Sequence, residues 1–210
     1  MRPLPRLHAI TDRNVLALGD FASRATRLAT TGPGIALHVR DRSGSGAMLT
    51  AVARQLLGLA RPLEASVFVN GRADVAAAVA AQGLQLGQGD LAPSDVRRGF
   101  GTSWVGWIGV SVHSIGAADV AIAEGADYVL VGSVFETATH PGRTPAGLAL
   151  VREVAARGKP VIAIGGITSE RAAAVRDAGA YGIAAIRALW HGEDPVQAAM
   201  TLLAPWMEAA

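Results

Sequence analysis

The chain contains no cysteine, which excludes disulfides, thiolate nucleophiles and thiolate metal ligands. A protein without cysteine is compatible with a reducing compartment, so we expect a cytoplasmic location. Lysine is nearly absent as well, because Lys159 is the one lysine and arginine supplies the other basic side chains. The formal net charge is only +2, so the composition gives no sign of a strongly basic surface.

The sequence lacks the signals of nucleic-acid binding, of membrane insertion and of a signal peptide. Aromatic residues make up 5% of the chain, and no arginine cluster is interleaved with them, so we expect no nucleic-acid binding. No apolar run approaches the roughly 20 residues of a membrane span, so we expect no membrane insertion. The basic residues of segment 1–6 are not followed by a long apolar stretch, so we expect no signal peptide.

What the chain does have is a repeated alternation of short apolar segments and helical segments. Half of the 210 residues are hydrophobic, enough for one sizeable core, and no linker divides the chain, so we expect a single domain covering 1–210. Apolar segments without polar alternation are typical of strands buried on both faces of a parallel sheet. We predict eight strands, over residues 7–11, 35–39, 65–69, 83–86, 107–110, 128–131, 160–164 and 182–186.

About eight helices alternate with these strands, which favours an α/β fold of the (β/α)8 TIM-barrel type. A doubly wound open sheet is the competing fold, and the count of eight units makes it the weaker alternative. In a barrel, the residues that follow the strands line one mouth, where active sites lie. Polar residues collect at those positions here, although the strands are almost purely apolar, and this concentration indicates an enzyme.

His113 follows the fifth strand and is a candidate general acid or base, since imidazole titrates near neutral pH. An equally weighted alternative is a histidine that only satisfies a loop carbonyl. For His38, which lies inside the second strand, a structural role is the better interpretation. His140 belongs either to a mobile lid or to an ordinary exposed loop, and His8 and His191 look incidental.

Glycines after the seventh strand indicate an anion site. Gly165 and Gly166 let the backbone approach a phosphate, and Arg187 after the eighth strand either adds a charged contact or is simply solvated. Arg40 suits a carboxylate or a phosphate, with an ion pair to a nearby aspartate as the rival interpretation. Hard cations need clustered carboxylates, which this mouth does not supply, and no histidine pair has zinc spacing, so we expect no metal.

The chain resembles the thiamine phosphate synthase superfamily over nearly its whole length. The matching pieces occur in order at 7–12, 37–42, 67–74, 84–90, 109–114, 126–139 and 161–167. The resemblance implies a barrel and an enzyme of thiamine biosynthesis. One branch of the superfamily, the synthases, joins a pyrimidine diphosphate to a thiazole phosphate with Mg²⁺. The other branch, the thiazole tautomerases of the TenI type, isomerises a carboxythiazole phosphate without a cofactor.

Four positions favour the tautomerase branch. Synthases carry an aspartate after the strand-three asparagine, a glutamine and a lysine in the strand-two motif, and a lysine in the strand-six loop. This chain instead has Gly71, His38, Arg42 and His140, so only Asp90 remains of the metal pair. Patterns shared with the tautomerases are His38 to Ser43, Asn70 to Arg72 and Val134 to Thr137.

The prediction is therefore a thiazole tautomerase that acts on a small-molecule thiazole phosphate, with no cofactor and no metal. The resemblance places the catalytic histidine at His113. The substrate-binding residues that we expect are Arg40, Asn70, Ser111, Thr137, Thr139, Gly166, Ile186 and Arg187. Two alternatives stay open: a thiamine phosphate synthase that tolerates the replacements, and a regulatory protein that binds thiazole or thiamine phosphates without catalysis. The number of subunits also stays open, and a homo-oligomer is one option.

Overall fold

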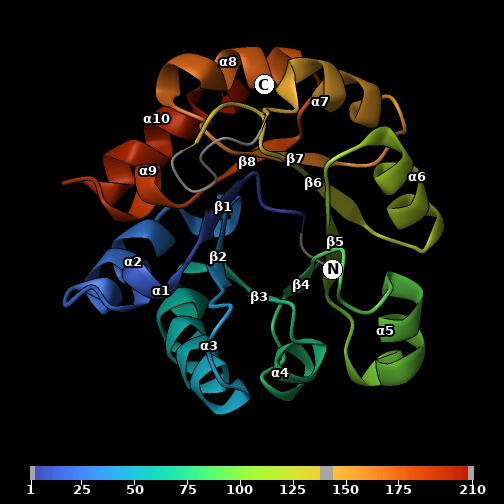
Figure 1. Ribbon diagram of the computed structural model, residues 1–210. Coiled ribbons are helices and arrows are strands. Elements are labelled where there is room, and N and C mark those ends of the chain that lie inside the picture. Colours follow the sequence, from blue (N-terminus) through green and yellow to red (C-terminus); the bar gives the residue numbers. More distant parts are fainter. Residues whose placement is uncertain (1–2, 138–143, 208–210) are drawn as a thin grey trace.

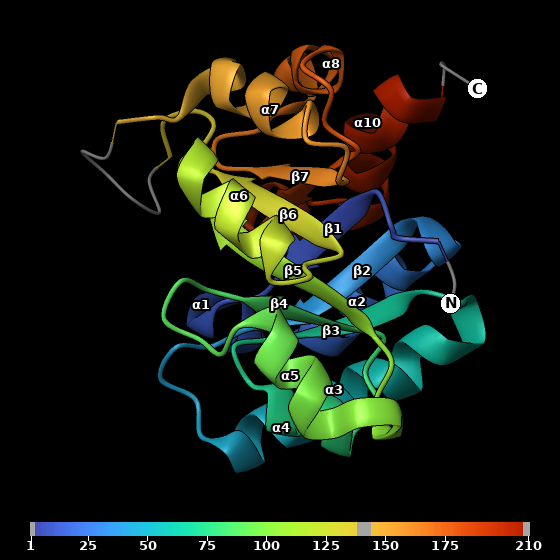
Figure 2. The same cartoon turned by 90° about the vertical axis from the view of Figure 1, so that its right-hand side faces the viewer.

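The computed structural model describes residues 3–137 and 144–207, and within these ranges the chain forms a closed barrel of eight strands. Every strand pairs in parallel with the next one along the chain, and β8 returns to pair with β1. Helices surround the strands on the outside in both views (Figures 1 and 2). The prediction of a (β/α)8 TIM barrel is confirmed.

The strands are β1 (Leu7–Ile10), β2 (Ile35–Val39), β3 (Ser66–Asn70), β4 (Gly83–Leu86), β5 (Trp107–Val112), β6 (Tyr128–Gly132), β7 (Val161–Ile164) and β8 (Gly182–Ala185). The helices are α1 (Arg13–Leu16), α2 (Phe21–Ala29), α3 (Gly46–Ala60), α4 (Ala73–Ala78), α5 (Pro93–Phe100), α6 (Ile115–Ala123), α7 (Gly147–Ala155), α8 (Ser169–Asp177), α9 (Arg187–Trp190) and α10 (Pro195–Met207). No helix of the described ranges is both long and apolar enough to cross a membrane.

The structure differs from the sequence-based prediction in a few boundaries. Strand β5 continues to Val112, so Ser111 lies within the strand and not in the loop after it. Two helices of four residues each, α1 and α9, were not expected. Helix α1 forms because the carboxylate of Asp12 accepts the backbone N–H of Val15 at 2.9 Å, which satisfies a donor that has no partner within the helix.

The barrel interior is filled by large side chains opposite glycines. Phe68 and Tyr128 are fully buried there, and their register partners on the adjacent strands are Gly83 and Gly109. A Cβ atom added at Gly109 would lie 2.0 Å from Cζ of Tyr128, far inside van der Waals contact. Glycine at this position is therefore required by packing, because the Tyr128 ring occupies the space that a side chain would need.

We predict opposite effects for two alanine substitutions in neighbouring elements. Gly109→Ala should lower the free energy of unfolding by about 1–3 kcal/mol, because it overpacks the barrel interior. Gly116→Ala is the control: Gly116 lies in α6, and nothing is within 4 Å of a Cβ built there. This change should raise stability by up to about 1 kcal/mol through helix propensity. Urea denaturation followed by circular dichroism measures both, and equal stability of the two variants would contradict the packing argument.

Candidate functional site

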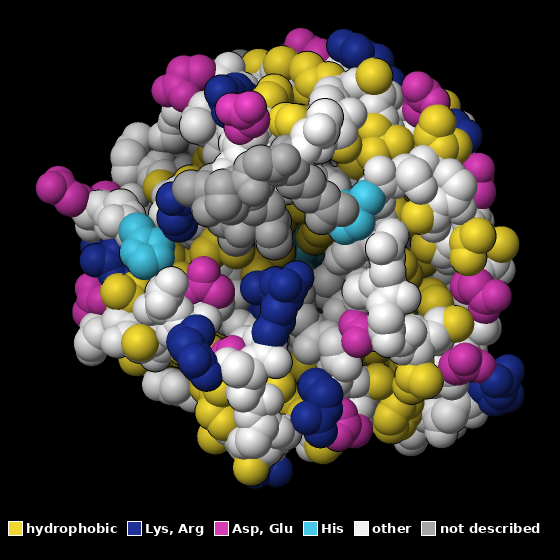
Figure 3. All heavy atoms as spheres, viewed as in Figure 1, with side chains coloured by type: hydrophobic (Ala, Val, Ile, Leu, Met, Phe, Trp, Pro, Cys, Tyr) yellow, Lys and Arg dark blue, Asp and Glu magenta, His cyan; other side chains and the backbone are white. Residues whose placement is uncertain are grey.

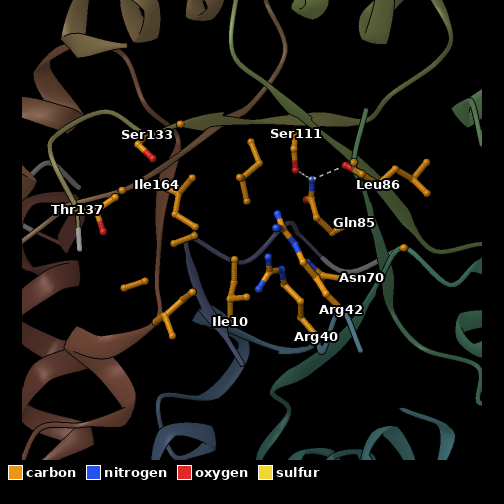
Figure 4. A pocket seen from close by; sticks show the side chains of 18 of the residues that line it. Ile10, Arg40, Arg42, Asn70, Gln85, Leu86, Ser111, Ser133, Thr137 and Ile164 are labelled. Carbon is orange, nitrogen blue, oxygen red and sulfur yellow. Dashed lines mark hydrogen bonds between the residues drawn. The ribbon is translucent and has the colours of Figure 1, made fainter. Parts of the chain in front are cut away.

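A cavity of about 1140 Å³ opens where the carboxyl ends of the strands converge. All eight strands or the residues just after them contribute to its wall: Ile10, Arg40, Asn70, Leu86, Ser111, Gly132, Ile164 and Ala185. A hollow is visible near the centre of the face in Figure 3, with basic side chains at its edge. Figure 4 shows the cavity from close by, with Arg40, Arg42, Asn70 and Gln85 on one side and Ser133, Thr137 and Ile164 on the other.

The structure brings together nearly all residues that the sequence singled out. His113, Arg40, Asn70, Ser111, Thr137, Gly166, Ile186 and Arg187 all line the cavity. Thr139 and His140 lie outside the described residues. Sequence reasoning did not select Gln85 or Ser133, which also line the cavity. Gln85 lies inside β4, a segment read as purely apolar, and a polar residue within such a strand was the signal that could have revealed it.

Guanidinium groups dominate the side of the cavity formed after β2. Arg40 and Arg42 both point into the cavity in Figure 4. Burial lowers the pKa of Arg40, and the like charge of Arg42 lowers it further, while Asp12 and Asp41 act in the opposite direction. Arg40 is half-buried and Arg42 is exposed, and an anion that binds between the two cations would offset their repulsion. This side of the cavity is therefore suited to a phosphate or diphosphate.

Backbone groups form the opposite side, after β7 and β8. Gly165 and Gly166 have φ values of +105° and +63°, a region that side chains other than glycine rarely adopt. A Cβ at Gly166 would lie 2.3 Å from the carbonyl oxygen of Glu136, so packing between two loops also demands glycine. Next to this loop, α9 begins at Arg187, and the first N–H groups of a helix have no acceptor within it. Such donors suit a phosphate.

His113 lies at the rim of the cavity, where its side chain is exposed. Its Nδ1 atom donates a hydrogen bond to the carbonyl oxygen of Gly132 at the end of β6. Since a carbonyl can only accept, Nδ1 carries a proton, and whenever the ring is neutral Nε2 has a lone pair that can accept a hydrogen bond. A hydrogen bond from His113 to a carbonyl is what the structural interpretation of this histidine expected. The same bond also fixes the orientation of the ring, with Nε2 as the possible acceptor.

A hydrogen-bond chain inside the barrel supports Ser111. The hydroxyl of Tyr128 donates to Oε1 of Gln85 at 2.7 Å, and Nε2 of Gln85 donates to Oγ of Ser111 at 3.1 Å. The second of these bonds is drawn in Figure 4. Because Ser111 accepts from Gln85, its own hydroxyl proton is available for a ligand in the cavity.

A second buried chain supports Asn70. Nδ1 of His8 lies 2.8 Å from Nε2 of His38, and Nδ1 of His38 lies 2.9 Å from Oδ1 of Asn70. Both histidines are fully buried. The structural role predicted for His38 agrees with this position. The interpretation of His8 as incidental is wrong, because the pairing of β1 with β2 places it against a residue 30 positions away.

The described residues do not fit a magnesium site held by protein carboxylates. Within the described ranges, no group of three or more His, Cys, Asp or Glu side chains could hold a metal ion. Asp90 lines the cavity, but Oδ2 of its carboxylate accepts the N–H of Gly87 at 2.7 Å. Beside it is Gly71, where a Cβ would be 3.3 Å from the same oxygen, so the adjacent position offers no second carboxylate. Hard cations bind clustered oxygen ligands, and one carboxylate is a poor supply.

Comparisons with known proteins decide the family. A family profile described as thiamine monophosphate synthase matches residues 7–189. The chain belongs to this family. A relative from Thermus thermophilus named thiamine-phosphate synthase is 40% identical over 95% of this chain and 96% of its own. One of the same name from Mycolicibacterium gilvum is 41% identical over 98% of this chain and 89% of its own.

A solved structure agrees with the sequence relatives. The thiamine phosphate pyrophosphorylase from Pyrococcus furiosus superimposes with a TM-score of 0.81 at 30% identity, over 97% of this chain and 96% of that one. The chain is thus a member of an enzyme family of thiamine biosynthesis with the TIM-barrel fold.

The prediction of a thiazole tautomerase, an isomerase, is contradicted by these comparisons. Relatives about as long as this chain carry the name of the other branch. The prediction rested on the replacements at Gly71, His38, Arg42 and His140. In the structure Arg42 lines the cavity with Arg40, so this position keeps a positive charge where the synthase motif has a lysine.

The buried histidines predict a loss of stability in mild acid. Burial lowers the pKa of His38 to about 4, and burial followed by the charge of His38 lowers the pKa of His8 well below its usual 6.5. The unfolded chain therefore binds more protons than the folded one between about pH 6.5 and pH 4. The stabilising contribution is complete above pH 6.5 and is lost as the pH falls toward 4, on the order of 3 kcal/mol for His38.

Urea denaturation at pH 7 and pH 5 measures this dependence. His38→Gln should make unfolding less dependent on pH, because it removes one buried titrating ring. His191→Gln, which removes an exposed histidine, is the matched control and should behave as the unaltered protein does. A variant His38→Gln with an unaltered pH dependence would contradict the assignment.

Proposed function

We propose that this protein is a thiamine phosphate synthase, a transferase that joins a pyrimidine diphosphate to a thiazole phosphate and releases pyrophosphate. The observation that carries the proposal is the 40% identity to a thiamine-phosphate synthase over 95% of this chain and 96% of that relative. The family match over residues 7–189 spans every strand end that lines the cavity.

The cavity supports a reaction between two phosphorylated molecules because its anion sites lie on two different sides. Arg40 and Arg42 follow β2, whereas Gly166 and Arg187 follow β7 and β8. We assign the diphosphate to the arginine side and the single phosphate of the thiazole to the glycine side. The pyrimidine and thiazole rings would then meet over the apolar floor, to which Ile10 and Ile164 contribute.

The arginines also account for how the chain promotes the reaction. When the bond to the diphosphate breaks, negative charge accumulates on the departing pyrophosphate. Fixed positive charges aimed at that group stabilise the transition state more than the bound substrate. Arg40 is half-buried, and the charge of Arg42 acts on it from nearby. No step of this proposal uses a metal ion, since the described residues do not build a site for one.

The remaining cavity residues orient the two rings. Ser111 offers its hydroxyl proton, and Nε2 of His113 offers an acceptor at the rim. Thr137 and Ile186 line the glycine side, where they complete the surroundings of the thiazole phosphate. These assignments follow from position in the cavity and from the direction of each hydrogen bond.

The proposal predicts synthase activity in the purified protein. Incubation with the pyrimidine diphosphate and the thiazole phosphate should release pyrophosphate and form one product whose mass contains both rings. Coupled phosphate detection and mass spectrometry measure these outcomes, with Mg²⁺ present and with a chelator. Release of no pyrophosphate under either condition, together with proton exchange on a thiazole substrate, would contradict the proposal.

Loss of one guanidinium should impair the reaction selectively. Arg42→Gln should lower kcat/KM for the diphosphate about 10- to 100-fold, since a hydrogen bond to a charged group contributes about 1.5–3 kcal/mol. Arg98→Gln is the matched control, because Arg98 lies on α5 with 77% of its side chain exposed. Equal values of kcat/KM for the two variants would contradict a role of Arg42 in binding the diphosphate.

A further inference from the structure

The buried pair of histidines behind Asn70 restricts where protons can be. Nε2 of His8 lies 3.0 Å from the carbonyl oxygen of Pro5, and its Nδ1 lies 2.8 Å from Nε2 of His38. Nδ1 of His38 then meets the side-chain amide of Asn70 at 2.9 Å. The three side chains thus form one line from a backbone carbonyl to the cavity wall, where Asn70 lies beside Gln85 (Figure 4).

The backbone carbonyl fixes the direction of the first bond. Because the oxygen of Pro5 can only accept, Nε2 of His8 carries a proton. In a neutral ring, Nδ1 of His8 is then an acceptor, so Nε2 of His38 donates to it. If His38 is neutral too, its Nδ1 carries no proton and needs a donor. The amide nitrogen of Asn70 is the donor at hand.

Two arrangements of Asn70 are consequently possible, and they differ by one proton. With Oδ1 toward His38, the chain needs an extra proton on Nδ1 and carries a positive charge. With the amide rotated by 180°, Nδ2 donates to His38, the chain is neutral, and Oδ1 faces the cavity. Such rotations exchange oxygen and nitrogen without altering the shape of the side chain, so the hydrogen-bond partners decide between them.

The surroundings favour the neutral chain. His8 and His38 are fully buried, and the rings packed against them are Phe68 and Tyr128, which carry no charge. The nearest charged group that acts on His38 is the cation Arg40, which opposes a second positive charge. An isolated charge buried in such a place costs several kcal/mol or neutralises itself.

We infer that the His8–His38 pair holds Asn70 with its carbonyl oxygen toward the cavity, so that Asn70 selects a hydrogen-bond donor, an amino or ring N–H group, on the substrate. The inference deepens the proposed function and rests on it for the identity of that substrate, a pyrimidine diphosphate. His8 and His38 are positioning residues, since they act through Asn70. Ser111 presents the opposite polarity, a donor, to the same cavity.

Nitrogen NMR of the unaltered, ligand-free protein tests the proton positions directly. The chain has five histidines, and substitution of His113, His140 and His191 assigns the signals of the other two. The expected spectrum at pH 7 shows both His8 and His38 neutral with the proton on Nε2. A coupling across the hydrogen bond should join Nδ2 of Asn70 to Nδ1 of His38. A cationic ring, or a proton on Nδ1 of His38, would overturn the inference.

A variant at Asn70 supplies a second readout. Asn70→Asp leaves only acceptor oxygens opposite His38, so Nδ1 of His38 should gain a proton at pH 7 and its NMR signals should become those of a cation. Asn14→Asp is the matched control, the same chemical change at an exposed asparagine, and should leave both buried rings neutral. A neutral His38 with unchanged proton positions in Asn70→Asp would count against the inference.

Kinetics separate positioning from a merely structural role. His8→Phe removes the acceptor for His38 and frees Asn70 to rotate, so KM for the pyrimidine diphosphate should rise about tenfold, with a smaller change in kcat. His8→Gln retains a donor and an acceptor and should restore KM. Failure of the rescue in a folded protein would overturn the positioning role. A protein without synthase activity would refute the proposed function while leaving the NMR result intact, so the two failures are distinguishable.

Discussion

The parallel closure of the barrel is the constraint on which the rest of the structure depends. Because β8 pairs with β1 and every other strand with its successor, all eight carboxyl ends meet around one opening. Backbone hydrogen bonds between strands satisfy the buried peptide groups and leave side chains to fill the interior. Residues as distant as Arg40 and Arg187 therefore line one cavity, although nothing in their local sequences brings them together.

In the proposed function, guanidinium groups bind one anion and backbone N–H groups bind the other inside this opening. The side after β2 places two guanidinium groups near each other, while the side after β7 and β8 offers peptide N–H groups at glycines and at a helix start. Guanidinium groups suit a multiply charged group, and peptide donors suit a compact phosphate. This division agrees with two phosphorylated substrates. It also shows why replacing lysine by arginine need not abolish diphosphate chemistry.

Polar residues within the barrel give the cavity wall its polarity. Tyr128 and Gln85 lead to Ser111, and His8 and His38 lead to Asn70. A buried donor or acceptor that lacks a partner costs about 1–3 kcal/mol, so each chain has one preferred direction of hydrogen bonding. The orientation of Ser111 and Asn70 is therefore set by hydrogen bonds to residues deeper in the barrel.

The sequence by itself determined the eight-unit barrel, the family and most of the cavity wall, because short apolar strands and their polar ends are local signals. It did not determine the branch, since the effect of Gly71 and Arg42 depends on neighbours such as Asp90 and Arg40. Nor could it reveal Gln85 inside β4, or that His8 pairs with His38. Those contacts exist only once the strands pair, because β1 and β2 come together in one register that sequence distance does not reveal.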